Sequence, residues 1–162
     1  MKIWIQKYGF WLLMAGIAIF WLYRQWPHNI AIEDIQLEDP SGQIKPLMIS
    51  KDSVTIIHFY AHWCGPCMRE LPEIAQIRKT YQAAGISIIC VTDDDFSFID
   101  DLKIRTGLNI FKTPSLKDLK VFSIPMTYIY NSKGEQTQRT EGSLEWLNPN
   151  TLTQILKDNN HE

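Results

Sequence analysis

Residues 63–67 read Trp-Cys-Gly-Pro-Cys, so two thiols lie two residues apart and can close into a small disulfide. The β-branched and aromatic residues at 54–60 predict a strand directly before this pair, and residues 65–84 read as a helix after it. A cysteine pair between a strand and a helix is more specific than the spacing alone. The pattern therefore predicts a redox-active site at the start of a helix in an α/β domain.

Cys64 and Cys67 are expected to have different roles. If Cys64 lies just before the first helical turn, unpaired backbone N–H groups and the positive end of the helix dipole stabilise its thiolate and make it the nucleophile. Pro66 suits the first turn because the N–H that proline lacks would have no partner there. Cys67 would be more buried and better placed to resolve a mixed disulfide than to start one. Trp63, beside the reactive thiol, is expected to form an apolar rim for substrate.

This stretch resembles the active site of the thioredoxin superfamily, which carries the same Trp-Cys-Gly-Pro-Cys string. Residues 67–72, Cys-Met-Arg-Glu-Leu-Pro, are similar to the C-x-x-E-x-P continuation of the TlpA/ResA/DsbE-like branch, which comprises membrane-tethered thiol-disulfide oxidoreductases of the bacterial cell envelope. Further landmarks follow in order, with a proline before a strand at 123–130, a turn at 131–134 and a glycine at 142. The resemblance extends over residues 32–158 and implies a thioredoxin-like α/β fold, with a central mixed β-sheet flanked by helices.

The resemblance also implies a substrate-binding role for Ile124 and Pro125. Pro125 would follow a cis peptide bond and lie opposite the cysteine pair, where the preceding backbone offers hydrogen bonds to an extended peptide. The alternative is an ordinary trans proline at a strand start, because only about 5 to 6% of X-Pro bonds in folded proteins are cis.

Two titratable residues are candidates for moving a proton to or from Cys67. Glu70 lies three residues later on the same helix, which brings the side chains close, and a partly buried carboxyl would have a raised pKa suited to proton exchange. His58 occupies the strand position at which thioredoxins carry a buried aspartate that assists this transfer, and a group that titrates near neutrality could serve there. The alternatives are a solvated helix glutamate and a core histidine with satisfied hydrogen bonds.

Metal and haem sites are not expected. His58, His62, Cys64 and Cys67 offer nitrogen and sulfur ligands, but strand alternation should separate His58 from the loop residue His62, and no second C-x-x-C follows. Met68 rather than histidine follows Cys67, so the haem-attachment motif is absent.

Hydrophobic periodicity and turn signals assign most of the chain to strands and helices. The expected strands are 35–37, 44–48, 54–60, 86–92, 126–130 and 135–141, and the expected helices are 65–84, 96–106 and 148–158. Residues 115–122 carry a helix-start signal, whereas 107–113 are left unassigned. The acidic run 93–95 is expected to be a solvated helix start, and Cys90 a small hydrophobe in a central strand.

Residues 8–23 are uncharged and lie between Lys7 and Arg24. As a helix they would extend about 24 Å, slightly less than a bilayer core of about 30 Å, which snorkelling of the flanking stems could complete. Aromatic residues at both ends of the segment resemble interfacial belts: Trp4, Tyr8, Trp11, Trp21, Tyr23 and Trp26. A cleaved signal peptide is the alternative, but no small-x-small cleavage pattern follows the apolar core. We therefore expect a transmembrane signal anchor at 1–26, a linker at 27–34 and a thioredoxin-like domain at 35–162.

The charge distribution favours a cytoplasmic N-terminus and an exported domain. Lys2 and Lys7 precede the apolar segment and Arg24 follows it, a small positive-inside bias. Beyond Trp26 the chain has 13 basic and 18 acidic residues, a balance of −5. Such an acidic domain is not expected to bind nucleic acid.

These features together predict a membrane-anchored thiol-disulfide oxidoreductase that reduces protein disulfides in the periplasm or an equivalent space, for example in cytochrome c maturation or in copper-site clients. The redox-active pair Cys64 and Cys67 replaces a cofactor, since no flavin or nicotinamide motif occurs. By resemblance, the partners are a disulfide-containing client protein and a membrane electron donor of the DsbD/CcdA type. The direction of electron flow stays open, because a few hydrogen bonds to Cys64 can turn a reductant into an oxidant. The alternative function is a Sco-like copper chaperone or metal-binding module, although that family uses a C-x-x-x-C pair.

Overall fold

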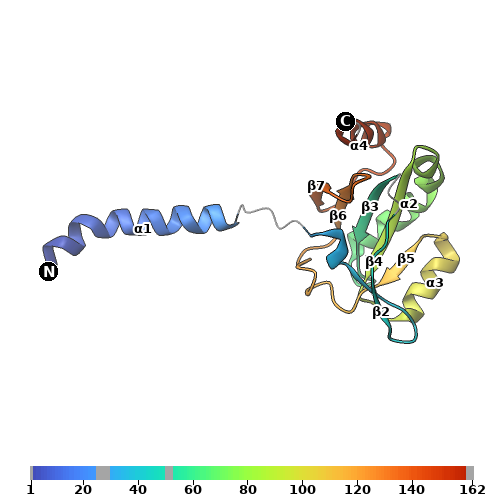
Figure 1. The fold of residues 1–162 in the computed structure, drawn as a ribbon, viewed down its shortest axis with the longest axis horizontal. Coiled ribbons are helices and arrows are strands. Elements are labelled where there is room, and N and C mark those ends of the chain that lie inside the picture. Colours follow the sequence, from blue (N-terminus) through green and yellow to red (C-terminus); the bar gives the residue numbers. More distant parts are fainter. Residues whose placement is uncertain (1, 25–29, 50–52, 160–162) are drawn as a thin grey trace.

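The computed structural model describes residues 2–24, 30–49 and 53–159, and Figure 1 shows an N-terminal helix followed by an α/β domain. The domain is built on a seven-stranded sheet with the order β2-β1-β5-β4-β3-β6-β7. Its strands are β1 (Gln36–Glu38), β2 (Ile44–Pro46), β3 (Val54–Phe59), β4 (Ile86–Thr92), β5 (Ile110–Lys112), β6 (Met126–Tyr130) and β7 (Gln136–Glu141). The helices are α1 (Lys2–Arg24), the 3-10 helix η1 (Ile32–Asp34), α2 (Gly65–Ala83), α3 (Phe96–Thr106) and α4 (Pro149–Asn159).

The sheet is mixed, as the resemblance implied. Strands β3, β4 and β5 run parallel, whereas β6 is antiparallel to β3 and β7 is antiparallel to β6. Helix α2 connects the parallel strands β3 and β4, so the cysteine helix is the crossover of a βαβ unit. Strand β3 lies near the middle of the sheet and is buried on both faces. The predicted thioredoxin-like α/β fold is therefore confirmed.

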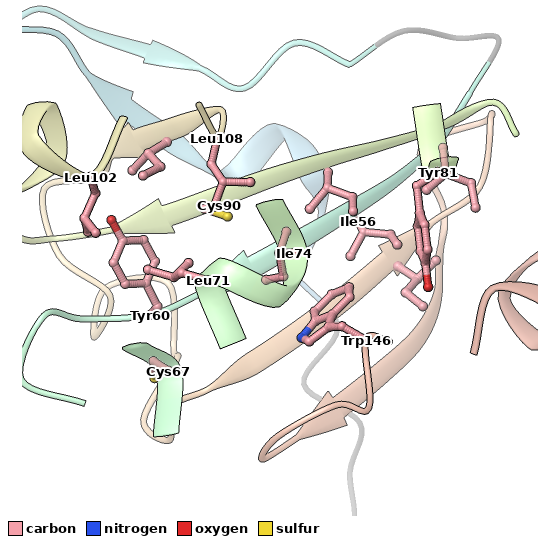
Figure 2. Close-up of a cluster of buried hydrophobic side chains, with 14 of the residues drawn as sticks. Ile56, Tyr60, Cys67, Leu71, Ile74, Tyr81, Cys90, Leu102, Leu108 and Trp146 are labelled. Carbon is pink, nitrogen blue, oxygen red and sulfur yellow. The ribbon is translucent and has the colours of Figure 1, made fainter. Parts of the chain in front are cut away.

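Alternate residues of β3 point into two separate hydrophobic clusters, as the two-residue period of a strand requires. Ile56 and Tyr60 lie in the cluster on the α2 face, together with Leu71 and Ile74 of α2, as Figure 2 shows. Phe59 belongs to the cluster on the opposite face. His58 shares the parity of Ile56 and Tyr60, so the sheet directs it towards α2 and the cysteines.

The N-terminal segment forms α1, which Figure 1 shows standing apart from the sheet domain. Its described side chains are exposed, including Leu12 at 73% and Phe20 at 66%. Within the described part of the chain, no helix is both long and apolar enough to cross a membrane. This finding does not support the predicted transmembrane span, whose uncharged run 8–23 is shorter than the roughly 20 residues that a bilayer core requires.

Two short segments differ from the sequence-based assignment. The unassigned stretch 107–113 contains β5, which pairs in parallel with β4 and through Glu38 with β1. The segment 115–122 contains turns at residues 116–120 rather than a helix, and the backbone N–H of Val121 donates to the carbonyl oxygen of Leu116 at 3.0 Å. The side chains of Val121 and Leu116 are buried in the second cluster, the one on the face of the sheet opposite α2. Packing on the sheet therefore fixes this segment.

Part of the predicted linker 27–34 belongs to the domain core. Ile30 and Ile32 are 6% and 5% exposed and lie in the second cluster. The hydroxyl of Tyr130 donates to the carbonyl of Ile30 at 3.0 Å, which ties this segment to β6. Residues 27–29 of the predicted linker lie outside the described residues.

Candidate active site

A disulfide joins Cys64 and Cys67 at the N-terminus of α2. Cys64 is the residue before the helix, and the backbone N–H of Cys67 lies 3.3 Å from its sulfur. The helix therefore presents an N–H donor to the Cys64 sulfur, the arrangement expected to stabilise a thiolate once the pair is reduced. Cys64 is 5% exposed and Cys67 is fully buried, so an incoming disulfide meets Cys64 first.

Glu70 and His58 meet in the buried space between α2 and the sheet. The Nε2 atom of His58 lies 3.6 Å from Oε2 of Glu70, and neither atom has a hydrogen-bond partner among the described residues. The other Glu70 oxygen accepts from the backbone N–H of Leu144 at 2.6 Å and from the indole N–H of Trp146 at 3.2 Å. On the far side of its ring, His58 Nδ1 lies 3.1 Å from the hydroxyl oxygen of Thr127. The sequence had left a solvated Glu70 open, and the structure rules that alternative out.

Burial favours the neutral form of both members of this couple. It lowers the pKa of His58 to about 4 and raises the pKa of Glu70, a rise that the hydrogen bonds from Leu144 and Trp146 partly offset. The 3.6 Å separation is an ion-pair distance, yet the cost of desolvating both groups works against charge on either of them. The couple can therefore hold one proton close to the resolving cysteine.

The Ile124–Pro125 peptide bond is cis, as the resemblance implied. Strand β6 begins at Met126, which pairs with Phe59 at the end of β3. Because the cysteine turn leaves β3 at this same end, the sheet brings Pro125 next to it. Ile124 packs against the cluster that contains both cysteines, and Trp63 is 70% exposed, as expected for a rim rather than a core residue.

A second histidine–carboxylate pair lies next to the cysteine turn, and sequence reasoning missed it. Asp94 is 6% exposed, accepts the backbone N–H of His62 at 2.8 Å and lies 2.6 Å from its Nδ1. The prediction that the acidic run 93–95 is a solvated helix start is wrong for Asp94, because the folded chain buries it against His62. In the sequence, only a histidine before the cysteine pair and an acidic residue after the next strand indicated this pair.

Cys90 lies in β4, fully buried in the α2-side cluster. Burial raises the pKa of its thiol to about 12, so it behaves as the small hydrophobe that the sequence predicted. Among the described residues, no group of three or more histidine, cysteine, aspartate or glutamate side chains is arranged to hold a metal ion.

Comparison of the sequence with known proteins gives a family and several relatives. The sequence model of the AhpC/TSA family matches residues 29–139. The chain is similar to the thiol-disulfide oxidoreductase ResA of Oceanobacillus iheyensis, with 27% identity over 150 residues that cover 82% of this chain and 78% of the relative. It is also 30% identical over 109 residues to the thioredoxin-like protein YneN of Bacillus subtilis, covering 62% of this chain and 64% of that protein.

Solved structures share the fold. A protein described as the thiol:disulfide interchange protein DsbE from Chlorobium tepidum superposes with a TM-score of 0.60 at 20% identity, covering 76% of this chain and 91% of that one. StoA from Bacillus subtilis superposes with a TM-score of 0.56 at 19% identity, covering 78% of this chain and 99% of that one. At these identities the similarity establishes the fold alone.

Proposed function

This chain belongs to the AhpC/TSA family of thioredoxin-like proteins, and on that basis we propose that it is a thiol-disulfide oxidoreductase that reduces protein disulfides through Cys64 and Cys67. Relatives named ResA and a sporulation thiol-disulfide oxidoreductase support this activity. The observation that carries the proposal is the geometry of the pair. Cys64 occupies the residue before α2 and faces a helix N–H, whereas Cys67 is buried behind it.

In the proposed reaction, the Cys64 thiolate attacks a substrate disulfide and forms a mixed disulfide with one substrate sulfur. The substrate backbone lies along the Ile124-Pro125 segment in this complex. Cys67 then gives its proton to the ionised form of the Glu70 carboxyl, which lies beside His58, and attacks the Cys64 sulfur. The substrate leaves as a dithiol, two electrons richer, and the enzyme is left with the Cys64–Cys67 disulfide.

The proposed direction is reduction. Gly65 and Pro66 between the cysteines match reducing thioredoxins, and the oxidised enzyme would be recharged by a membrane electron donor of the DsbD/CcdA type. Clients in cytochrome c maturation or proteins with copper-site cysteines fit this direction. An equilibrium potential against glutathione as oxidising as that of DsbA, about −120 mV, would overturn it.

We also propose that the enzyme works on the outer side of the cytoplasmic membrane, with α1 holding it there. Exposed apolar side chains along α1 and the two lysines that precede its apolar run, Lys2 and Lys7, support this placement. Fractionation of cells that express the native chain should recover it with membranes, and a membrane-impermeant thiol reagent should label reduced Cys64 in intact spheroplasts. Recovery of the full-length protein from the cytosol, unlabelled, would contradict the placement.

The activity and the roles of the two cysteines can be tested with one pair of variants. The wild type should reduce insulin with dithiothreitol as electron source, and Cys67→Ser should accumulate a mixed disulfide with its client because nothing releases it. Cys64→Ser should trap nothing, since the nucleophile is gone. Cys90→Ala is the matched control, because it removes a cysteine outside the site. Loss of activity in Cys90→Ala but not in Cys64→Ser would refute the proposed function.

A further inference from the structure

Disulfide reduction at this site needs proton transfers in two places. Cys67 must lose a proton within the protein, whereas the substrate sulfur displaced by Cys64 leaves as a thiolate that must gain one. His58 and Glu70 are 0% and 4% exposed, so they can serve Cys67 but not a sulfur that departs towards solvent. The second proton needs a donor on the exposed side of the cysteine turn.

His62 lies on that side. The backbone N–H of Cys64 donates to the carbonyl of Ala61 at 3.0 Å, so residues 61–64 form a tight turn with His62 at its first corner. The imidazole is 42% exposed, unlike that of His58. His62 and Cys64 are the two residues of this turn whose side chains can exchange a proton.

Asp94 fixes the orientation of this imidazole. One carboxylate oxygen accepts the backbone N–H of His62 and the other accepts from Nδ1, so the acid grips both the backbone and the ring. Phe98 on α3 stacks on the ring with 4.3 Å between centroids and an angle of 8°. With Nδ1 committed to Asp94, Nε2 is the nitrogen left to exchange a proton, the arrangement that a carboxylate imposes on a catalytic histidine.

The surroundings keep Asp94 available to His62. Its carboxylate is 4% exposed, and its backbone N–H donates a hydrogen bond to the Thr92 hydroxyl at 3.2 Å. The neighbouring Asp93 accepts the backbone N–H of Leu116 at 3.2 Å, and Asp95 is the residue before α3. The Tyr60 hydroxyl and Cys90 thiol on the sheet side are both held neutral by burial, which raises the pKa of each.

We propose that His62 is the proton donor to the substrate sulfur that Cys64 displaces, with Asp94 as its positioning residue, an inference that rests on the proposed function. The Cys64 sulfur bonds to one substrate sulfur as the substrate S–S bond breaks. The displaced sulfur keeps the electron pair of the broken S–S bond. It takes a proton from Nε2 of the His62 imidazolium. Because the ring is partly exposed, solvent restores that proton before the next turnover.

The test uses two uncharged disulfides that differ in how much they need a proton. Bis(2-hydroxyethyl) disulfide releases a basic alkyl thiolate, whereas 4,4′-dithiodipyridine releases a weakly basic thiopyridone that leaves without help. In single-turnover reactions of the reduced full chain, His62→Gln should slow the alkyl disulfide at least about tenfold and leave the aromatic one unchanged. Asp94→Asn should show the same selective loss, because an amide cannot hold the ring in the same tautomer. The matched control is Asp101→Asn on the exposed face of α3, which should change neither rate.

The wild type gives a second readout that does not depend on a variant folding. Because only a protonated donor can help the alkyl thiolate to leave, the alkyl rate should fall relative to the aromatic rate as pH rises, and thiolate formation at Cys64 cancels in this ratio. A pH-independent ratio, or an equal slowing of both disulfides by His62→Gln, would overturn the assignment. If the wild type reduces neither disulfide, the proposed function fails instead.

Discussion

His58 is held by Thr127 on one side and faces Glu70 on the other, without exposure to solvent. Its pKa is lowered by burial from 6.5 to about 4, so between these values the folded protein binds fewer protons than the unfolded chain. The stability associated with a neutral His58 is therefore fully present above pH 6.5 and is lost as the pH falls through about 4.

We expect His58→Asn to remove this acid sensitivity. Between pH 7 and pH 4 the free energy of unfolding of the wild type should fall relative to the variant, by on the order of 3 kcal/mol from this residue. Urea unfolding of both proteins at pH 7, 5.5 and 4 measures the difference. Parallel pH dependences would show that His58 is not held neutral. An unchanged pH profile of disulfide reduction in the variant would separately exclude His58 from proton transfer.

At the scale of elements, the segment between β7 and α4 is fastened to the site through Glu70. Leu144 and Trp146 both donate to the same carboxylate oxygen, and the Trp146 ring also lies edge-on to His58 at 5.6 Å. These hydrogen bonds lower the pKa of Glu70 against the rise caused by burial. This segment contributes no cysteine, yet it helps to set the protonation of Glu70 for the step in which Cys67 resolves the mixed disulfide.

We expect Trp146→Phe to raise the pKa of Glu70 further, because the ring remains while the indole N–H is lost. Loss of this buried hydrogen bond should also lower the free energy of unfolding by about 1–3 kcal/mol. Infrared difference spectroscopy of the protonated carboxyl across pH measures the titration directly. Trp63→Phe is the matched control, because Trp63 is exposed and should leave the Glu70 signal in place. A Glu70 titration that does not move in Trp146→Phe would contradict this coupling.

The parts that sequence predicted were those set by neighbours in the chain. The cysteine helix, the Glu70 position and the β6–β7 hairpin depend on spacings of a few residues, which helix and strand periods translate into geometry. The three-residue strand β5 gives too short a pattern to recognise, and its place depends on pairing with β4. The pair of His62 and Asp94 joins residues 32 positions apart, so it exists only once α2 has returned the chain to the sheet.

At the scale of the whole molecule, the direction of electron flow and the stability of the fold are linked. The native structure changes the potential of the cysteine pair only as far as it stabilises the disulfide and dithiol forms differently. If the protein is a reductant, the disulfide form should unfold with the larger free energy, by about 1.4 kcal/mol for each 30 mV below the potential of the unfolded chain. Urea unfolding with and without a phosphine reductant tests this. A reduced form that is more stable than the oxidised form would indicate an oxidant.

The ladder between β3 and β6 also determines where this chain can change length. Five consecutive residue pairs, from Thr55 with Tyr130 to Phe59 with Met126, place Pro125 beside the cysteine turn. One residue inserted in either strand would turn every following side chain to the other face. Lengthening the turn at 131–134 would leave this alignment intact. Natural and engineered insertions should therefore accumulate at that turn and be absent from β3 and β6.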